Sequence, residues 1–390
     1  MFSKLFDSFL VHYLERFNDH CFTVKIGDNE YTIGDGESEF TVIVNRDIPK
    51  KDLLISAELA LGEAYMRKDI EIEGDLFKAL CVVLGHVGKD SINRKVLSSL
   101  FNAGLKKKDQ KQQVSSHYDL GNEFYKLWLD ETMSYSCAYF KHDDDSLKDA
   151  QYQKVHHILD KLYLKEGMTL LDIGCGWGFL LIEAARKYGV KGYGCTLSEE
   201  QWKKGQERIK EYGLEGQVEI ELIDYRDVAA SGRTFDRIVS IGMLEHVGRP
   251  NFPLYMEDAS DMLKDGGVFL LHYISDPSEK ETSAWIRKYI FPGGCLPSLR
   301  EMVSLAYDYD MNIIDVESLR YHYYKTLMHW YNNFQGVREQ VEAKRGSEFV
   351  RMWELYLCGC AAGFYIGNMD LHQILMTKGV TNELPLTRWY

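Results

Sequence analysis

The sequence predicts a doubly wound α/β fold, with helices on both faces of a parallel sheet, and a small α+β unit at the N-terminus. The first observation is a buried-strand pattern that ends in a glycine-rich turn, Leu170 to Gly178, followed by a helix-compatible segment over 179–187. The second is the alternation of strand and helix patterns over residues 168–272. The third is that polar side chains directly follow those strands, where the ligands of such sheets bind.

The composition is that of a large globular chain with an acidic surface. The 390 residues are 45% hydrophobic and carry a formal net charge of −13, so we expect a sizeable core and no nucleic-acid partner. The eight cysteines have no metal-ligand spacing, and the first residues lack a signal-peptide core. We therefore expect reduced thiols, no metal and a cytoplasmic location. No apolar run approaches the roughly 18 residues of a spanning helix, so any membrane contact is expected to be peripheral.

The N-terminal segment begins with an amphipathic pattern, in which apolar residues recur at helical spacing from Phe2 to Phe17. Such a helix lies either on a bilayer or on its own domain, and the mixed charges of Lys4 and Glu15 favour the second. Strands are predicted next over 22–26, 31–33 and 40–44, and helices over 56–66 and 77–85. This unit has no catalytic constellation, so we expect it to serve binding or assembly.

A basic break follows over residues 88–111. Lys106, Lys107 and Lys108 begin a stretch almost free of apolar residues, which predicts a linker. Two interpretations stay open: a solvated hinge, or attraction to anionic phospholipid headgroups, to which each basic residue contributes about 1 kcal/mol near the surface. We call residues 96–116 the basic linker. Beyond an aromatic-rich stretch over 117–140, Ser146 and Asp149 predict the start of a helix that runs to about Leu162.

The main sheet is predicted from strands over 168–173, 190–196, 218–223, 235–241 and 267–272, with helices over 179–187, 199–212 and 254–263. The polar residues at the carboxyl ends of these strands are Asp172, Thr196, Ser198, Asp224, Tyr225, Glu245, His246 and His272. Aromatic-rich helical segments then cover 285–291, 321–334 and 349–364. They are expected to cover the ligand edge of the sheet as an apolar substrate cleft, or to add core, or both.

The glycine turn itself indicates the ligand. Gly174, Gly176 and Gly178 have the spacing Gly-x-Gly-x-Gly rather than the dinucleotide pattern Gly-x-Gly-x-x-Gly, and no lysine or arginine is present to bind a pyrophosphate. An adenosine ligand without phosphates fits better, and S-adenosylmethionine is the usual one. Taken alone, the turn is also compatible with a loop that only closes a strand–helix connection.

Several motifs in one order closely resemble the cyclopropane-fatty-acyl-phospholipid synthases and, more distantly, the mycolic-acid cyclopropane synthases. They include His117-Tyr-Asp-Leu-Gly-Asn, Tyr135-Ser-Cys-Ala-Tyr-Phe, the glycine turn and Gly242-Met-Leu-Glu-His-Val-Gly, and they cover residues 117–390. The resemblance implies a class I S-adenosylmethionine-dependent methyltransferase fold. It also implies a lipid-binding domain over 1–95, the basic linker over 96–116 and a catalytic domain over 117–390.

The resemblance also implies site residues. The expected S-adenosylmethionine contacts, with the strand-end residues that we add to them, are Tyr135, Ser136, Asp172, Gly174, Gly176, Gly178, Thr196, Leu197, Gln201, Asp224 and Tyr225. A bicarbonate ion would be held by Cys137, Glu245, His272, Tyr323 and the backbone of Ile274. Cys360 matches a cysteine sometimes named as catalytic, and the adjacent Cys358 leaves open which thiol matters.

The implied reaction adds a methylene group to the cis double bond of unsaturated acyl chains in membrane phospholipids. Transfer of a methyl group to an alkene creates a carbocation, so the site must exclude water and place a base, here bicarbonate, near the new carbon. The resemblance further implies a homodimer that contacts the inner face of the membrane peripherally. The alternatives are methylation of a small amine, a methyl-branched acyl product, and a non-catalytic lipid-binding sensor of S-adenosylmethionine.

Overall fold

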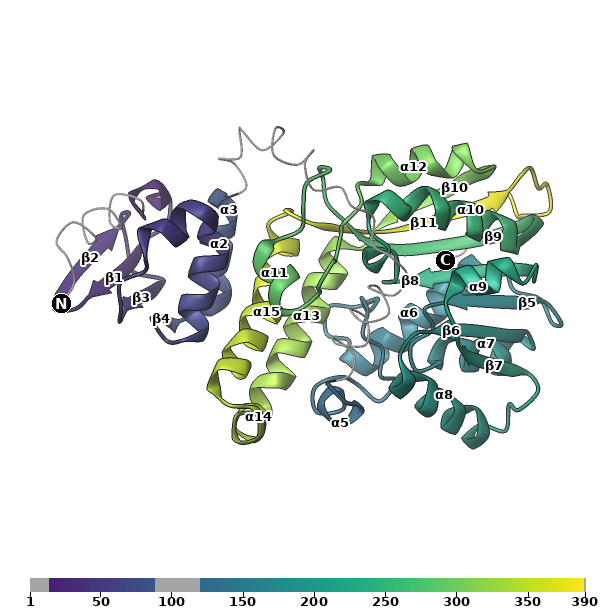
Figure 1. The fold of residues 1–390 in the computed structure, drawn as a ribbon, viewed down its shortest axis with the longest axis horizontal. Coiled ribbons are helices and arrows are strands. Elements are labelled where there is room, and N and C mark those ends of the chain that lie inside the picture. The colour runs from purple at the N-terminus through teal and green to yellow at the C-terminus, as the bar shows by residue number, and fades with distance from the viewer. Residues whose placement is uncertain (1–13, 88–119, 389–390) are drawn as a thin grey trace. The chain divides into compact units, whose positions relative to one another are not determined.

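The computed structural model describes residues 14–87 and 120–388, which form two compact units (Figure 1). The first unit combines the N-terminal residues with 283–290 and 327–368, and the second combines 120–282, 291–326 and 369–388. Most of the predicted amphipathic N-terminal helix and the whole basic linker lie outside the described residues.

The first unit is built on a four-stranded sheet with the order β2-β1-β3-β4. Its strands are β1 (Phe22–Ile26), β2 (Asn29–Ile33), β3 (Phe40–Val44) and β4 (Ile70–Gly74). The helices are α2 (Lys50–Met66), which is interrupted by an extended residue at Ser56, and α3 (Leu76–Val87). The three predicted strands and both predicted helices are confirmed, and β4 is an addition to them.

Four helices between residues 284 and 365 pack largely within this first unit. They are α11 (Ala284–Tyr289), α13 (Arg320–Gly336), α14 (Arg338–Arg345) and α15 (Ser347–Tyr365), and the division between the units falls inside α13. Arg351 of α15 donates to the backbone carbonyls of Tyr65 and Ile70, at 2.6 and 2.9 Å. Gly62 of α2 lies so close to Trp285 of α11 that a Cβ atom there would be 2.5 Å from the indole. These helices are therefore part of the N-terminal core.

The second unit contains a seven-stranded sheet with the order β10-β11-β9-β8-β5-β6-β7. Its parallel strands are β5 (Thr169–Ile173), β6 (Lys191–Thr196), β7 (Val218–Leu222), β8 (Phe235–Ile241) and β9 (Leu263–Ser275). All five were predicted, although β9 is longer than its prediction. The sequence analysis did not predict β11 (Asp370–Lys378), which runs antiparallel to β9, or β10 (Met311–Ser318), which pairs with β11.

Helices cover both faces of this sheet, as the doubly wound prediction requires. The helices on one face are α6 (Leu147–Lys161), α7 (Phe179–Tyr188) and α8 (Glu199–Glu211), and those on the other are α9 (Tyr225–Ala230), α10 (Phe252–Met262) and α12 (Leu299–Asp308). Alternate strand residues enter the two cores: Leu170 packs with the first group of helices and Leu171 with the second. Because both faces are filled, a ligand is left with the carboxyl edge of the strands.

Two local details agree with the sequence. The Ser146 hydroxyl accepts a hydrogen bond from the backbone N–H of Asp149 at 3.1 Å, so the predicted N-cap of α6 is present. Over residues 14–87 and 120–388, no helix combines the length and the apolar character that crossing a bilayer requires.

Candidate active site

The glycine turn between β5 and α7 has a backbone that only glycine adopts easily. Gly174, Gly176 and Gly178 have φ angles of 79°, 56° and 79°. A Cβ atom on Gly174 would lie 2.9 Å from Met243, whereas a Cβ atom on Gly176 would meet no atom within 4 Å. Gly174 therefore permits close packing against the loop after β8, and Gly176 leaves open space beside the turn.

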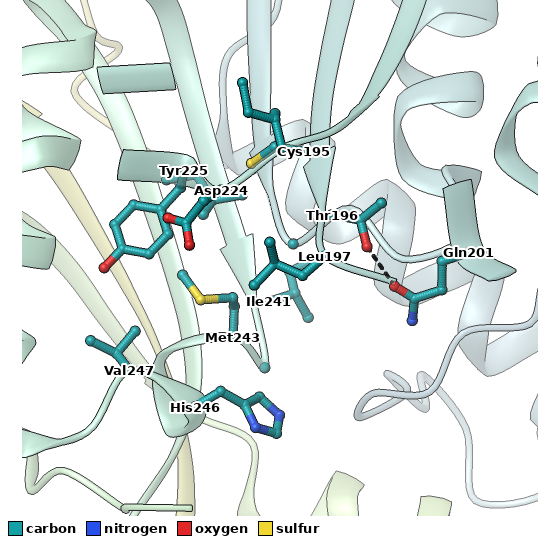
Figure 2. Close-up of a pocket in the computed structure, with 14 residues that line it drawn as sticks. Cys195, Thr196, Leu197, Gln201, Asp224, Tyr225, Ile241, Met243, His246 and Val247 are labelled. Atoms are coloured by element: carbon teal, nitrogen blue, oxygen red, sulfur yellow. Dashed lines mark hydrogen bonds between the residues drawn. The ribbon is translucent and has the colours of Figure 1, made fainter. Parts of the chain in front are cut away.

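A pocket lies at the carboxyl ends of β5, β6, β7 and β8 (Figure 2). The space between its walls is about 690 Å³ with its open mouth included. Its lining residues are Ile173, Gly174, Cys195, Thr196, Leu197, Gln201, Ile223, Asp224, Tyr225, Ile241, Gly242, Met243, His246 and Val247. The pocket thus brings together six of the predicted cofactor residues: Gly174, Thr196, Leu197, Gln201, Asp224 and Tyr225.

Short-range hydrogen bonds hold the polar groups of this pocket in place. The Thr196 hydroxyl donates to Gln201 Oε1 at 2.8 Å, as Figure 2 shows, and accepts from the backbone N–H of Ser198 at 3.2 Å. Asp224 caps α9 and accepts from the Arg226 guanidinium with both carboxylate oxygens, at 2.8 and 2.7 Å. No lysine or arginine of the described residues lines the pocket, so it suits an uncharged adenosyl group better than a pyrophosphate.

Asp172 lies one residue before the pocket, at the end of β5. Its side chain is buried, and Oδ1 has no hydrogen-bond partner within the described part of the chain. Burial raises the pKa of this carboxyl to about 7, although the nearby Lys154 ammonium acts in the opposite direction. Asp172 is thus a predicted cofactor residue that the structure leaves beside the pocket rather than in its wall.

The predicted residues Tyr135 and Ser136 lie in a loop held by α6. The Ser136 carbonyl accepts from Gln151 at 3.0 Å, and the Ser136 hydroxyl accepts from the buried Lys154 ammonium at 3.0 Å. The Tyr135 ring lies 5.3 Å from that of Tyr125 on α5 (Asn122–Tyr125).

Tyr125 in turn connects this loop to the glycine turn. Its ring lies 5.8 Å from Trp177 of the turn, and the Trp177 indole donates to Asn122 at 2.8 Å. Aromatic contacts therefore join α5, the loop of Tyr135 and the glycine turn.

A second group of predicted residues is centred on Glu245 and His272. Glu245 Oε1 accepts from the backbone N–H of Ile274 at 2.7 Å, whereas its buried Oε2 has no partner among the residues described. Burial raises the pKa of Glu245 to about 7. The Ile274 N–H, predicted to bind bicarbonate, is thus engaged by Glu245 in this structure.

His272 is buried on β9, and its register partner on β8 is Ile241. His272 Nδ1 lies 3.1 Å from Nε2 of Gln373, while its own Nε2 lacks a hydrogen-bond partner among residues 14–87 and 120–388. Burial, and then the charges of Lys154 and Lys161, lower the pKa of His272 to about 3. The imidazole is therefore neutral at physiological pH.

Cys137 and Tyr323 both contact the carbonyl of Leu319, the residue directly before α13. The Cys137 thiol is fully buried and lies 3.9 Å from the Leu319 carbonyl, which also accepts from the Tyr323 backbone N–H at 3.0 Å. Leu319 donates to the carbonyl of Leu371 on β11, the strand that pairs with β9 next to His272. Backbone contacts thus connect Cys137 and Tyr323 to the strand pair that carries His272.

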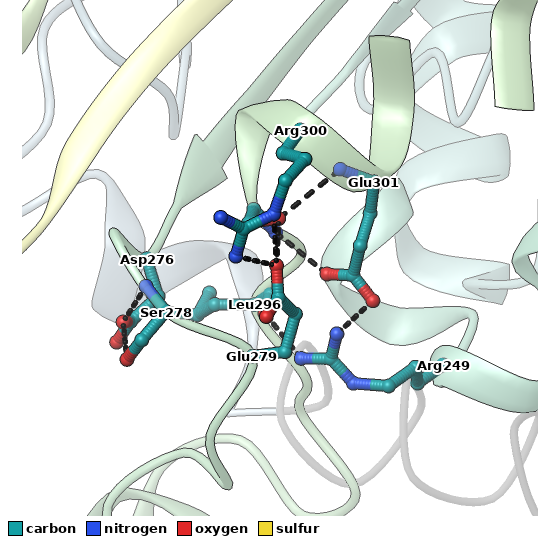
Figure 3. Close-up of polar contacts among 8 residues, drawn as sticks. Arg249, Asp276, Ser278, Glu279, Leu296, Arg300 and Glu301 are labelled. Carbon is teal, nitrogen blue, oxygen red and sulfur yellow. Dashed lines mark hydrogen bonds and ion pairs between the residues drawn. The ribbon is translucent and has the colours of Figure 1, made fainter. Parts of the chain in front are cut away.

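An ion-pair cluster fixes the segment after β9 that packs on the Glu245 loop (Figure 3). Arg249 pairs with Glu301 at the start of α12, and Glu279 accepts from Arg300 and from the Ser298 hydroxyl, at 2.5 and 2.8 Å. Ser298 and Glu301 form a capping box on α12.

This segment is tied directly to the site. The backbone N–H of Cys295 donates to the carbonyl of Glu245 at 2.9 Å. The cluster in Figure 3 therefore supports the backbone from which the Glu245 side chain extends.

Cys360 is on α15 and belongs to the first unit. Burial raises the pKa of its thiol to about 12, and it raises the pKa of the Cys358 thiol as well. A thiol that stays protonated at neutral pH is a weak nucleophile.

Sequence reasoning missed several residues of both sites. Gly242, Met243 and Val247 line the pocket, and their position directly after the fourth predicted strand was a usable signal. Lys154 and Gln373 gave no such signal, because one lies in a helix and the other in a strand that was not predicted. In the part of the chain that the structure describes, no cluster of three His, Cys, Asp or Glu residues is arranged to hold a metal.

Comparison with known proteins places these features in a family. Residues 105–374 match the family described as mycolic acid cyclopropane synthetase, and residues 9–89 match a domain family of unknown function. The cyclopropane-fatty-acyl-phospholipid synthase of Escherichia coli K12 is 40% identical over 87% of this chain and 88% of its own. A probable fatty acid methyltransferase of Pseudomonas putida is 37% identical over 94% of each chain.

A solved structure shows the same fold. A mycolic acid cyclopropane synthase crystallised with SAH and CTAB superposes with a TM-score of 0.65 and 36% identity. It covers 69% of this chain and 98% of its own.

Proposed function

This chain belongs to the mycolic acid cyclopropane synthetase family and is an S-adenosylmethionine-dependent methyltransferase; we propose that it cyclopropanates unsaturated acyl chains of membrane phospholipids. One-carbon transfer to the cis double bond, followed by proton loss, closes the ring. The observation that carries the proposal is that Glu245 Oε2 and His272 Nε2 are buried and lack a hydrogen-bond partner among the described residues. Both residues lie beside pocket residues, since Glu245 precedes His246 and His272 is the register partner of Ile241. The relative from Escherichia coli is a cyclopropane-fatty-acyl-phospholipid synthase, which supports a phospholipid substrate.

The pocket residues fit S-adenosylmethionine. Thr196 and Gln201 present fixed polar groups, Gly176 leaves space beside the turn, and the described lining residues include no lysine or arginine that would repel a positively charged sulfonium. When bound, S-adenosylmethionine supplies an electrophilic methyl group. Among this chain's residues, the glycine turn would admit the adenosyl group, and Tyr135 and Ser136 would bind it from the loop held by α6.

The residues around His272 fit a small oxyanion. A buried polar atom without a partner costs roughly 1–3 kcal/mol. His272 Nε2 has no hydrogen-bond partner among the residues that the structure describes, so a ligand that hydrogen-bonds to it would remove this cost. Bicarbonate carries an O–H of its own, and burial raises the pKa of Glu245 to about 7. Either group can therefore supply the proton of a hydrogen bond between them, which avoids contact between two unprotonated anions. When bound, bicarbonate would supply a base beside the reacting carbon.

The chain's own groups would position that anion. His272 and Tyr323 would donate hydrogen bonds to it, and Glu245 would orient it, with Ile274 contributing its N–H if Glu245 releases it. Cys137 is too deeply buried to ionise, so it would shape the site. We propose no nucleophilic role for Cys360.

The proposal extends to the setting of the reaction. Acting on phospholipid acyl chains requires contact with a membrane, so we propose a cytoplasmic enzyme that binds the inner face of the membrane peripherally and works as a homodimer. The N-terminal domain and the basic linker are the proposed lipid-binding parts, and residues 117–390 are the proposed catalytic domain.

Product analysis tests the function. Purified enzyme is incubated with S-adenosylmethionine and vesicles of a phospholipid with one cis double bond, and the lipids are extracted for mass spectrometry and proton NMR. We expect acyl chains heavier by one CH₂ group, with the upfield signals of a cyclopropane ring. A methyl-branched chain, a methylated small amine added as competitor, or no product would each contradict the proposal.

A further inference from the structure

Gln373 makes a side-chain contact that fixes the imidazole of His272. Both side chains are about 1% exposed, and the two residues are register partners on β11 and β9. The amide Nε2 of Gln373 lies 3.1 Å from His272 Nδ1. The proposed function gives Gln373 no role.

The protonation state of the imidazole makes this contact informative. His272 is buried, and Lys154 and Lys161 add positive charge nearby, so the neutral ring is strongly favoured. A neutral imidazole carries one hydrogen, on either Nδ1 or Nε2, and the group that contacts one nitrogen decides which.

An amide nitrogen can donate a hydrogen bond but cannot accept one. With Gln373 Nε2 facing it, His272 Nδ1 must be the bare acceptor, and the hydrogen must be on His272 Nε2. We propose that Gln373 is a positioning residue that holds His272 as the Nε2–H tautomer, which makes this histidine a hydrogen-bond donor and prevents it from serving as the base.

The tautomer determines what His272 Nε2 can do chemically. Nε2 carries the hydrogen and has no partner in the described part of the protein, so it is a donor suited to an anion. This consequence rests on the proposed function, whereas the tautomer itself does not. The tautomer also distinguishes two mechanisms. A histidine with a protonated Nε2 can hold an anion that acts as the base, whereas a histidine with a bare Nε2 could remove the proton directly.

The same strand pair offers a matched control. Ser275 on β9 and His372 on β11 form a second cross-strand contact, with 2.7 Å between the Ser275 hydroxyl and His372 Nδ1. Ser275→Ala removes a contact between the same strands without touching His272. A general loosening of β9 and β11 would therefore affect both variants, whereas a tautomer effect at His272 requires the change at Gln373.

NMR of the full chain labelled with ¹⁵N in the histidine rings tests the tautomer directly, because bare and protonated ring nitrogens resonate in well-separated ranges. His272 signals are assigned by their absence in His272→Asn. We expect the wild-type proton on Nε2. In Gln373→Glu the carboxylate accepts from Nδ1–H, so the proton should move to Nδ1, and Gln373→Leu should give a mixture. Ser275→Ala should shift His372 signals only.

Turnover provides the second readout. We expect Gln373→Glu to lose about a hundredfold or more in turnover with S-adenosylmethionine affinity unchanged. Gln373→Leu should need more bicarbonate to reach half of its maximal rate. A wild-type spectrum with the proton on Nδ1 would overturn the inference even if neither variant folds, and so would a folded Gln373→Glu that keeps the wild-type tautomer. Full wild-type activity without carbonate would show that bicarbonate is not the base, but it would not affect the conclusion about the His272 tautomer.

Discussion

At the scale of single residues, we propose that Glu245, His272 and Tyr323 act on one bound anion, so changing any of them should affect chemistry and leave cofactor binding intact. None of the three lines the cofactor pocket. We therefore expect Glu245→Gln, His272→Ala and Tyr323→Phe to keep S-adenosylmethionine affinity in calorimetric titration. Each should lose on the order of a hundredfold in turnover, the lower end of the scale for general base catalysis.

The dependence of turnover on bicarbonate shows whether the base is bound bicarbonate or a side chain of the protein. Added bicarbonate should partly restore Glu245→Gln, since this variant keeps the His272 donor and only loses an orienting group. Ser231 lies at the end of α9 and outside both sites, so Ser231→Ala serves as a control. Its turnover should equal that of the wild type, with and without added bicarbonate. Undiminished wild-type turnover in rigorously carbonate-free buffer would show that a side chain is the base.

The glycine turn gives a second prediction at this scale. Gly174→Val and Gly176→Val should abolish S-adenosylmethionine binding. At Gly174 the new Cβ would lie 2.9 Å from Met243, and at Gly176 it would enter open space beside the turn. Gly213, after α8, also has a positive φ of 64° and an unobstructed Cβ direction, so Gly213→Val carries similar backbone strain away from the pocket. Calorimetry showing full affinity in a folded Gly176→Val variant would remove this turn from the cofactor site.

Spacing along the chain made the first site predictable but not the second. The glycine turn and the residues after β6 and β7 are local patterns, because a parallel strand delivers its next residues to one sheet edge. The contact between Gln373 and His272 joins residues 101 positions apart through the register of two antiparallel strands. No local pattern encodes that register, and β11 follows a helical stretch that gave no sign of returning to the sheet.

At the scale of elements, a buried charge cluster joins β10 to α6. Glu317 on β10 accepts from His157 at 2.7 Å and from Lys161 at 2.5 Å, and Lys161 is only 1% exposed. Burial acts to raise the pKa of Glu317, but the hydrogen bonds and charges of His157 and Lys161 lower it to about 2. The carboxylate therefore stabilises the folded state above its ordinary pKa of 4.5, and this stabilisation is lost as the pH falls towards 2.

Removing this charge should destabilise the second unit. We expect Glu317→Gln to lower the free energy of unfolding by about 3 kcal/mol at pH 7, since it leaves the buried Lys161 without its nearest carboxylate. The difference from wild type should shrink below pH 4. Urea denaturation at several pH values measures both effects. Glu221 of β7 forms a more exposed pair with Arg233, so Glu221→Gln should cost less than about 1 kcal/mol, and an equal loss in both variants would contradict this expectation.

The bounds of helices and strands were predicted best where the sequence contains an N-cap pair or an uninterrupted apolar strand. Ser146 and Asp149 marked the start of α6, and the apolar runs of β5 and β8 lie within a residue of their predicted bounds. The helices over 285–364 were located correctly, but their packing partner was not evident from sequence. Their apolar faces only indicate burial, and it took contacts such as that of Arg351 with Tyr65 to show burial against the N-terminal sheet and helices.

At the scale of the whole molecule, charge is unevenly distributed between the acidic chain and the basic linker. The net charge is −13, yet Lys106, Lys107 and Lys108 are consecutive. An acidic protein is repelled by an anionic bilayer, so a local basic segment would determine which part approaches the surface. The linker lies outside the residues that the structure describes.

Neutralising the three lysines to glutamine should weaken binding to anionic vesicles far more than to neutral ones. At about 1 kcal/mol for each lysine, the loss is somewhat more than about a hundredfold in partitioning at low salt, and raised salt should reduce wild-type binding in the same way. Co-sedimentation with vesicles of defined charge measures both. A matched triple change of Lys203, Lys204 and Lys210 on α8 removes the same charge from another part of the chain. If both triple variants bind anionic vesicles as wild type does at low salt, the basic linker is a solvated hinge, and membrane attachment must come from the N-terminal domain.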